Sequence, residues 1–216
     1  MTTLSLSYTY RASVLKDNAP LIIMLHGYGS DENDLFSFAS ELHENFCIIS
    51  VRAPYQIQPY GNAWYAINFD AEQGKWSDDK QAIKSRDCVV KFIDEVIETY
   101  PINENNVTLL GFSQGSILSY SIALNYPEKV RHVIALSGYI NLDLNFPNYL
   151  NNDFSRLDVY CSHGSQDQVI PVTWARRTPT ILNKLGITHN YEEYPVGHGV
   201  SPPNFLALKN WIESKI

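Results

Sequence analysis

The chain has 216 residues, with 16 Lys and Arg against 23 Asp and Glu and a net charge of −7 at pH 7. A chain of this length can bury a core of ordinary size, and no linker-like change of composition divides it, so we expect one domain over residues 1–216. The acidic balance and the lack of a basic run argue against nucleic acid or an anionic membrane surface as the main partner, and leave a small ligand open.

The beginning of the sequence has no basic region followed by an apolar core, and no later apolar run approaches membrane-spanning length. We therefore expect a cytoplasmic protein without stable membrane association. The three cysteines, Cys47, Cys88 and Cys161, lie far apart among apolar neighbours. This pattern predicts buried free thiols, and no pair of them has the spacing of metal ligands.

The first half of the chain alternates apolar strands with helical segments. Residues 20–27 and 46–54 are short, apolar and end at Gly or Pro, as buried strands do. Residues 31–44 begin with acidic side chains, which favours a helix. Residues 77–100 repeat apolar side chains at helical spacing, which predicts a long amphipathic helix.

The second half continues this alternation. Its expected elements are a strand at 105–111, a helix at 114–125, strands at 130–138, 157–164 and 188–196, a helical stretch at 172–185 and a last helix from about 203. Such alternation predicts an α/β fold, with a mostly parallel central sheet and helices on both faces. Ligands of such sheets bind at the carboxyl ends of the strands.

The stretch GFSQGS places Ser113 directly after an expected strand and directly before an expected helix. A sharp reversal at this seam brings strand and helix together two residues before and after the serine, where Gly111 and Gly115 leave room. A Gly-x-Ser-x-Gly pattern between a strand and a helix is the setting of a nucleophilic serine. The structural alternative is close packing at the glycines, with Ser113 as an ordinary helix cap.

A serine nucleophile needs a histidine base and a carboxylate that orients the base. His198 lies between glycines just past an expected strand end, and Asp167 follows the glycine that ends the strand at 157–164. The order Ser113, Asp167, His198 is that of α/β-hydrolases. Taken singly, Asp167 and His198 also fit ordinary turn residues.

Other titratable residues fit less well. His26 and His163 each precede a strand-ending glycine, so we interpret both as structural residues that hold the following loops. Asp143 and Asp158 are the rival acids, and Asp143 is the better of them because it follows the strand at 130–138.

Two backbone N–H groups should stabilise the oxyanion in this fold. One belongs to the residue after the nucleophile, Gln114. The other should come from the loop LHGYGSDENDL, where glycines on both sides of Tyr28 allow its amide to point inward. Taken alone, HGYG also fits a simple strand-ending turn.

The segments LHGYGSDENDL, AWYAINFD, GFSQGS, HGSQDQVIP and GHGVSPP occur in this order over nearly the whole chain. They resemble the phospholipase/carboxylesterase family of α/β-hydrolases, which includes acyl-protein thioesterases. The resemblance implies a Ser-His-Asp esterase with Ser113, Asp167 and His198 as triad. The family usually has a second glycine after the serine turn, whereas this chain has Ser116.

About twenty residues separate the strands at 130–138 and 157–164, which is too few for a cap domain, so the site should be open. Residues 53–77 are rich in aromatics and could form an apolar wall over the site, with Trp64, Tyr65 and also Tyr139 as substrate-binding residues. The equal alternative for residues 53–77 is an added strand packed on the body.

Three functions remain. The first is a carboxylesterase for small soluble esters of short to medium acyl chains. The second is an acyl-protein thioesterase or lysophospholipase, which needs a longer apolar channel. The third, a non-catalytic binding protein on the same fold, is disfavoured by the complete set of catalytic residues. No metal or organic cofactor is implied, and the oligomeric state is left open.

Overall fold

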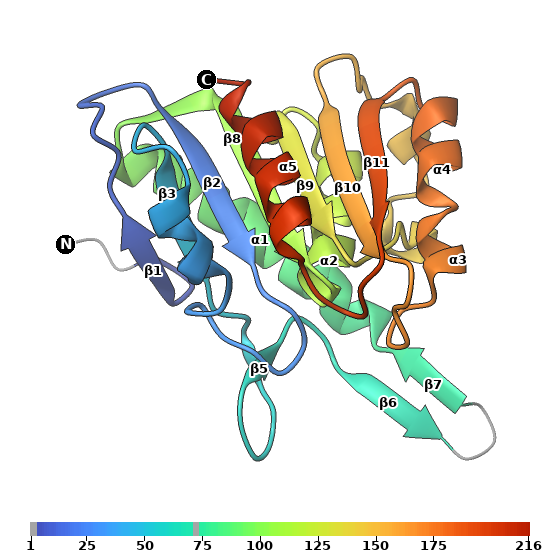
Figure 1. The fold of residues 1–216 in the computed structure, drawn as a ribbon. Helices are drawn as coiled ribbons and strands as arrows, with labels where there is room; N and C mark the ends of the chain where they lie inside the picture. The colour runs from blue at the N-terminus through green and yellow to red at the C-terminus, as the bar shows by residue number, and fades with distance from the viewer. Residues whose placement is uncertain (1–3, 71–73) are drawn as a thin grey trace.

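The computed structural model describes residues 4–70 and 74–216 (Figure 1). Its main sheet has seven strands in the order β1-β3-β2-β8-β9-β10-β11. Only the β1–β3 pair is antiparallel, and the other neighbours in this sheet are parallel. The strands are β1 (Tyr8–Arg11), β2 (Ala19–Leu25), β3 (Cys47–Val51), β8 (Ile102–Phe112), β9 (His132–Leu136), β10 (Asp158–Gly164) and β11 (Thr188–Tyr194).

Helices connect most of these strands. They are the 3₁₀ helix η1 (Leu35–Glu41), α1 (Asp79–Thr99), α2 (Gln114–Asn125), the single turns η2 (Leu142–Leu144) and η3 (Tyr149–Asn151), α3 (Val172–Ala175), α4 (Thr178–Lys184) and α5 (Pro202–Glu213). Figure 1 shows α5 in front of the sheet and α1 and α2 behind it. The predicted α/β architecture, with helices on both faces of a mostly parallel sheet, is confirmed.

Alternate residues of the buried strands face two separate cores. In β2, Leu21 and Ile23 belong to the core beneath α1 and α2, whereas Ile22 and Met24 pack with η1 and α5. Side chains of a strand point alternately to opposite faces, so a strand covered on both faces must be apolar throughout. This requirement explains why β2 was recognisable as an uninterrupted apolar run.

The helix predicted at 31–44 is wrong in type and length, because only η1 forms there. Short polar side chains bind the local backbone instead: Asp31 accepts from the Asn33 amide, and Ser37 donates to the Asp34 carbonyl. Such bonds compete with the helical pattern. The helical stretch at 172–185 is also divided, since Pro179 fits the first turn of α4 but not a helix interior.

The segment between β3 and α1 forms two small antiparallel pairs outside the main sheet. The first joins β4 (Tyr55–Gln56) to β5 (Asn62–Ala63), and the second joins β6 (Ile67–Asp70) to β7 (Gly74–Ser77). Figure 1 shows both pairs beyond the carboxyl ends of β2 and β8. Residues 71–73 lie outside the described part of the chain.

Two further expectations can be compared with the fold. Cys47 and Cys161 are buried free thiols, but Cys88 is exposed because it lies on the outer face of α1. Residues 137–157, all of which the structure describes, contain only the two single turns η2 and η3. The connection between β9 and β10 therefore contributes no cap domain to the carboxyl edge of the sheet.

Candidate active site

Ser113 occupies the tight turn between β8 and α2. Its backbone has φ 53° and ψ −114°, a strained conformation for a residue with a side chain. A Cβ on Gly111 would lie 2.4 Å from the Gly115 carbonyl oxygen, and a Cβ on Gly115 would lie 1.9 Å from that of Leu25. Both glycines are therefore required by the close approach of strand and helix.

Ser113, His198 and Asp167 lie in one line of hydrogen bonds. His198 Nε2 is 2.9 Å from Ser113 Oγ, and His198 Nδ1 is 2.7 Å from Asp167 Oδ2. The other carboxylate oxygen, Oδ1, accepts from the amides of Val169 at 2.8 Å and Ile170 at 2.9 Å. An ionised carboxylate only accepts, so Nδ1 carries the ring hydrogen and the Nε2 lone pair faces the serine.

The loops that carry the acid and the base are joined to each other. The amide of Gln166 donates to the Val196 carbonyl at 3.0 Å. A Cβ on Gly164, the last residue of β10, would lie 2.1 Å from the Gly197 carbonyl oxygen. Because Gly164 has no side chain, the turn before His198 can cross directly over the end of β10.

The surroundings keep Asp167 ionised. Burial by itself would raise the pKa of this carboxyl group, but hydrogen bonds from His198, Ile170 and Val169 outweigh it and hold the pKa below its ordinary value. The carboxylate is fully buried, whereas 18% of the His198 side chain is exposed. Water can therefore reach the imidazole but not the acid.

Two other histidines hold the backbone around this line. His163 Nε2 is 2.9 Å from the Ile170 carbonyl oxygen and 3.3 Å from Asp167 Oδ2, and the side chain is buried. His26 Nδ1 donates to the Gly27 carbonyl at 2.7 Å, while its Nε2 accepts from the Ala53 amide at 3.0 Å. Both contacts agree with the structural roles predicted for these residues.

The loop after β2 lies beside the serine. A Cβ on Gly27 would be 3.5 Å from the Ser113 Cβ, which places the neighbouring residue Tyr28 at the edge of the site. Gln114 begins α2, so its amide is one of the N–H groups without a partner inside that helix. Among the hydrogen bonds of the described residues, none involves the amide of Tyr28 or Gln114.

The sequence profile of the Phospholipase/Carboxylesterase family matches residues 12–216. The chain belongs to the phospholipase/carboxylesterase family. A probable SOBER1-like carboxylesterase of Arabidopsis thaliana is 26% identical over 156 residues, 71% of this chain and 59% of that protein. Acyl-protein thioesterase 1 of Emericella nidulans is 25% identical over 225 residues, 94% of this chain and 92% of that protein.

Solved structures show the same fold at low sequence identity. The crystal structure of esterase PE8 covers 100% of both chains with a TM-score of 0.84 at 22% identity. That of the Bacillus cereus carboxylesterase covers 98% of this chain and 95% of its own, with a TM-score of 0.81 at 18% identity. These structures show the fold, and the family profile with its curated relatives identifies the chain as a serine hydrolase of the esterase and thioesterase type.

Within this family fold, the prediction that Trp64 and Tyr65 contact substrate is not supported by their burial. Trp64 is 0% exposed and Tyr65 3%. Both pack in the core beneath α1, and the Trp64 indole N–H donates to the His26 carbonyl at 2.9 Å. Neither ring is open to a ligand, so the aromatic wall predicted over the site does not include them.

Tyr139 does lie at the site and is partly exposed. It follows Gly138, at which a Cβ would be 3.2 Å from the Ser113 carbonyl oxygen. Its ring packs edge to face on Trp174, with centroids 5.1 Å apart. Trp174 is 42% exposed and was not predicted; its place in α3, seven residues after Asp167, was the available signal.

Gly138 also explains how the chain accommodates Ser116 in place of the family's usual glycine. Ser116 is buried, and a Cβ on Gly138 would lie 2.4 Å from its Oγ. A side chain at position 138 would therefore collide with Ser116.

The rival acids lie elsewhere. Asp143 is exposed in η2, and Asp158 accepts from Lys215 Nζ at 2.6 Å at the opposite end of β10. Neither carboxylate has a hydrogen bond to a histidine among the described residues.

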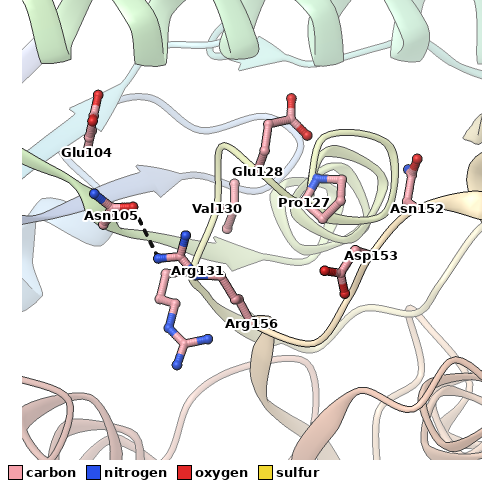
Figure 2. A pocket seen from close by; sticks show the side chains of 9 residues that line it. All are labelled: Glu104, Asn105, Pro127, Glu128, Val130, Arg131, Asn152, Asp153 and Arg156. Atoms are coloured by element: carbon pink, nitrogen blue, oxygen red, sulfur yellow. Dashed lines mark hydrogen bonds between the residues drawn. The ribbon is translucent and has the colours of Figure 1, made fainter.

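A small cavity of about 260 Å³ lies at the amino ends of β8, β9 and β10, the opposite edge of the sheet from Ser113. Figure 2 shows the side chains that line it. Arg131 and Arg156 line it together with three carboxylates, and Arg156 donates to Asn105 at 3.2 Å. Its charges are mixed and its polar side chains face solvent, so it has no share in the site.

Residues 4–70 and 74–216 contain neither a membrane-spanning helix nor a metal-binding cluster. No described helix has both the length and the apolar character needed to cross a membrane. In the same residues, no three His, Cys, Asp or Glu side chains gather in a way that could hold a metal ion.

Proposed function

We propose that the protein is a serine carboxylesterase that hydrolyses small soluble esters of short to medium acyl chains through an acyl-enzyme intermediate. The observation that supports it most is His198, whose Nε2 is 2.9 Å from Ser113 Oγ while its Nδ1 is 2.7 Å from Asp167 Oδ2. This is the geometry of a base poised between a nucleophile and the acid that orients it.

In the first half of the reaction, His198 Nε2 takes the proton from Ser113 Oγ as the oxygen attacks the acyl carbon. The negative charge that forms on the carbonyl oxygen is stabilised by the amides of Tyr28 and Gln114. His198 then gives its proton to the departing alkoxide, which leaves as the alcohol. Asp167 stays ionised and stabilises the imidazolium.

In the second half, water takes the place of the alcohol. His198 removes a proton from the water as its oxygen attacks the acyl carbon of the Ser113 ester. The second tetrahedral intermediate collapses to the carboxylic acid, and Ser113 Oγ recovers its proton from His198. Water can reach His198 because 18% of its side chain is exposed.

The preference for short to medium chains rests on the walls of the site. Tyr139, which follows Gly138 beside Ser113, packs on Trp174 in a partly exposed aromatic pair, but the connection that follows, residues 140–157, contains only the turns η2 and η3. Each buried methylene adds about 0.8 kcal/mol to binding, so affinity should rise with chain length until this pair is covered.

The second candidate is an acyl-protein thioesterase, because relatives of that name align over nearly the whole chain. A series of p-nitrophenyl esters and matched acyl thioesters from two to sixteen carbons decides between them. We expect an optimum at short to medium esters. An optimum at sixteen carbons, or a strong preference for a palmitoyl thioester, would favour the thioesterase, and lack of labelling by a fluorophosphonate would exclude both.

A further inference from the structure

Trp64 and Tyr65 lie between the two segments that carry the proposed oxyanion donors. They directly follow β5, which lies beside the loop after β2; Ser30 of that loop pairs with Asn62 of β5 (Figure 1). The Gln114 side chain binds both residues: its Oε1 accepts from the Trp64 amide at 2.8 Å, and its Nε2 donates to the Tyr65 carbonyl at 2.8 Å.

The indole of Trp64 completes the connection on the other side. Its Nε1–H donates at 2.9 Å to the carbonyl of His26, two residues before Tyr28. The His26 ring in turn donates to the Gly27 carbonyl and accepts from the Ala53 amide. One chain of hydrogen bonds therefore runs from the first residue of α2, through Trp64, to the backbone that leads to Tyr28.

The burial of these groups makes the connection strong. Trp64 and His26 are 0% exposed and Gln114 is 3% exposed, so water cannot replace a broken bond. A buried donor or acceptor left without its partner costs about 1–3 kcal/mol. A third bond, from Ser85 Oγ to the Trp64 carbonyl, fixes the same residue to α1.

We propose that Trp64 is a positioning residue that sets the spacing between the amides of Tyr28 and Gln114. The inference rests on the proposed function, since it concerns the oxyanion of that reaction. Pre-placed donors stabilise the transition state only when they meet the oxyanion at hydrogen-bond distance, and small displacements cost rate rather than substrate affinity. Trp64, which the sequence predicted to contact substrate, thus acts on the reaction through the backbone.

The substitution Trp64→Phe tests this role because it removes the indole N–H and keeps an aromatic ring in the core. The active fraction of each preparation is counted with a fluorophosphonate, so that misfolded protein does not enter kcat. We expect kcat per active serine to fall about 10-fold or more, against 10²–10³ for complete loss of a donor. KM should change less than twofold.

An inhibitor gives a second readout that a merely structural role would not move. A trifluoromethyl ketone analogue adds to Ser113 and places an oxyanion between the two amides, so its affinity should fall by the same factor as kcat. If Trp64→Phe does not fold, Gln114→Met removes the other side of the connection and leaves the Gln114 backbone amide in place. It should give the same two losses.

Two matched variants serve as controls. Trp211→Phe makes the same chemical change in α5, where Trp211 packs on His132 at the amino end of β9, and should leave kcat unchanged. Ser85→Ala loosens Trp64 from α1 but leaves its indole bond, and should cost less than Trp64→Phe. An equal loss in Ser85→Ala would overturn the role of the indole.

The outcomes separate this inference from the proposed function. An active wild type whose Trp64→Phe variant keeps full kcat and inhibitor affinity overturns the positioning role alone. A loss confined to KM, or a fall in kcat without a fall in inhibitor affinity, also overturns it. A wild type that neither reacts with the fluorophosphonate nor hydrolyses esters overturns the proposed function.

Discussion

Neighbouring strands β8 and β9 end in the same way but in different surroundings. Ser113 and Ser137 both have φ 53°, and the amide of each donates to a carbonyl at or near the end of the next strand, that of Leu136 at 2.8 Å and that of Ser162 at 2.9 Å. Only Ser113 has a histidine hydrogen-bonded to it among the described residues. A strained serine at a strand end is therefore a product of the sheet, whereas its activation depends on the loop that brings His198.

The largest effect should come from removing the hydroxyl of Ser113, with the same change at Ser137 as its control. Ser113→Ala should lower kcat by about 10⁴-fold or more, because the nucleophile is lost, while the melting temperature stays close to that of wild type. Ser137→Ala should keep kcat within a few-fold. Turnover near wild type in Ser113→Ala would contradict the assignment of the nucleophile.

The second effect concerns what distinguishes the two strand ends, the oriented base. Asp167→Asn should lower kcat by about 10³–10⁴-fold, since an amide can donate to Nδ1 and so favour the wrong imidazole tautomer. The matched variant Asp143→Asn changes an exposed carboxylate in η2 and should leave the rate nearly unchanged. A greater loss in Asp143→Asn would show that the acid has been misassigned.

The third effect is on stability and arises at the other end of β9. Burial, with Arg131 nearby, lowers the pKa of His132 to about 4. The unfolded chain takes up this proton near the ordinary histidine value, about 6.5, so stability is complete above that pH and is lost as the pH falls towards 4.

When the pH is lowered from 7 to 4.5, the free energy of unfolding of His132→Leu should therefore fall by about 2–3 kcal/mol less than that of wild type. Urea unfolding at the two pH values measures the difference. His189→Leu, a change on the edge strand β11, is the control and should follow wild type. Equal losses in wild type and His132→Leu would disprove the role of His132.

The smallest effect concerns Tyr139, two positions after Ser137, and the Trp174 ring that packs on it. Tyr139 and Trp174 should provide apolar contact for the acyl chain, so Trp174→Ala should lower kcat/KM for a hexanoate ester about 10-fold relative to the acetate. Leu206→Ala removes a more exposed apolar side chain on α5 and should change the rate for neither ester. A uniform loss across chain lengths in Trp174→Ala would argue against acyl contact.

Most of the fold could be predicted because the buried strands are uninterrupted apolar runs and the long helix has one apolar face. Strand β1 escaped prediction, since Tyr8–Arg11 at an edge is only partly buried and carries no such run. The segment at 31–44 was predicted as a helix because its acidic start suits one, but Asp31 accepts from the Asn33 amide and Asp34 accepts from the Ser30 hydroxyl instead.

The candidate triad could be located because strand order places Ser113, Asp167 and His198 at one edge of the sheet, and the structure brings them within hydrogen-bond distance. Their catalytic roles stay a prediction. Trp64 could not be placed in advance, since its burial depends on partners at His26 and Gln114, which are distant in sequence. Local pattern shows that a segment is aromatic, but not which side of the loop its rings occupy.

The close crossing at Gly164 has a consequence for sequence drift. A methyl group there would meet the carbonyl oxygens of Val196 and Gly197 at 2.4 and 2.1 Å, just before His198. Rigid backbone cannot yield as a flexible side chain can, so an alanine would move the base away from the serine before it disturbed either core. Among natural variants of this chain, position 164 should therefore stay glycine even where the surrounding strand exchanges its apolar residues freely.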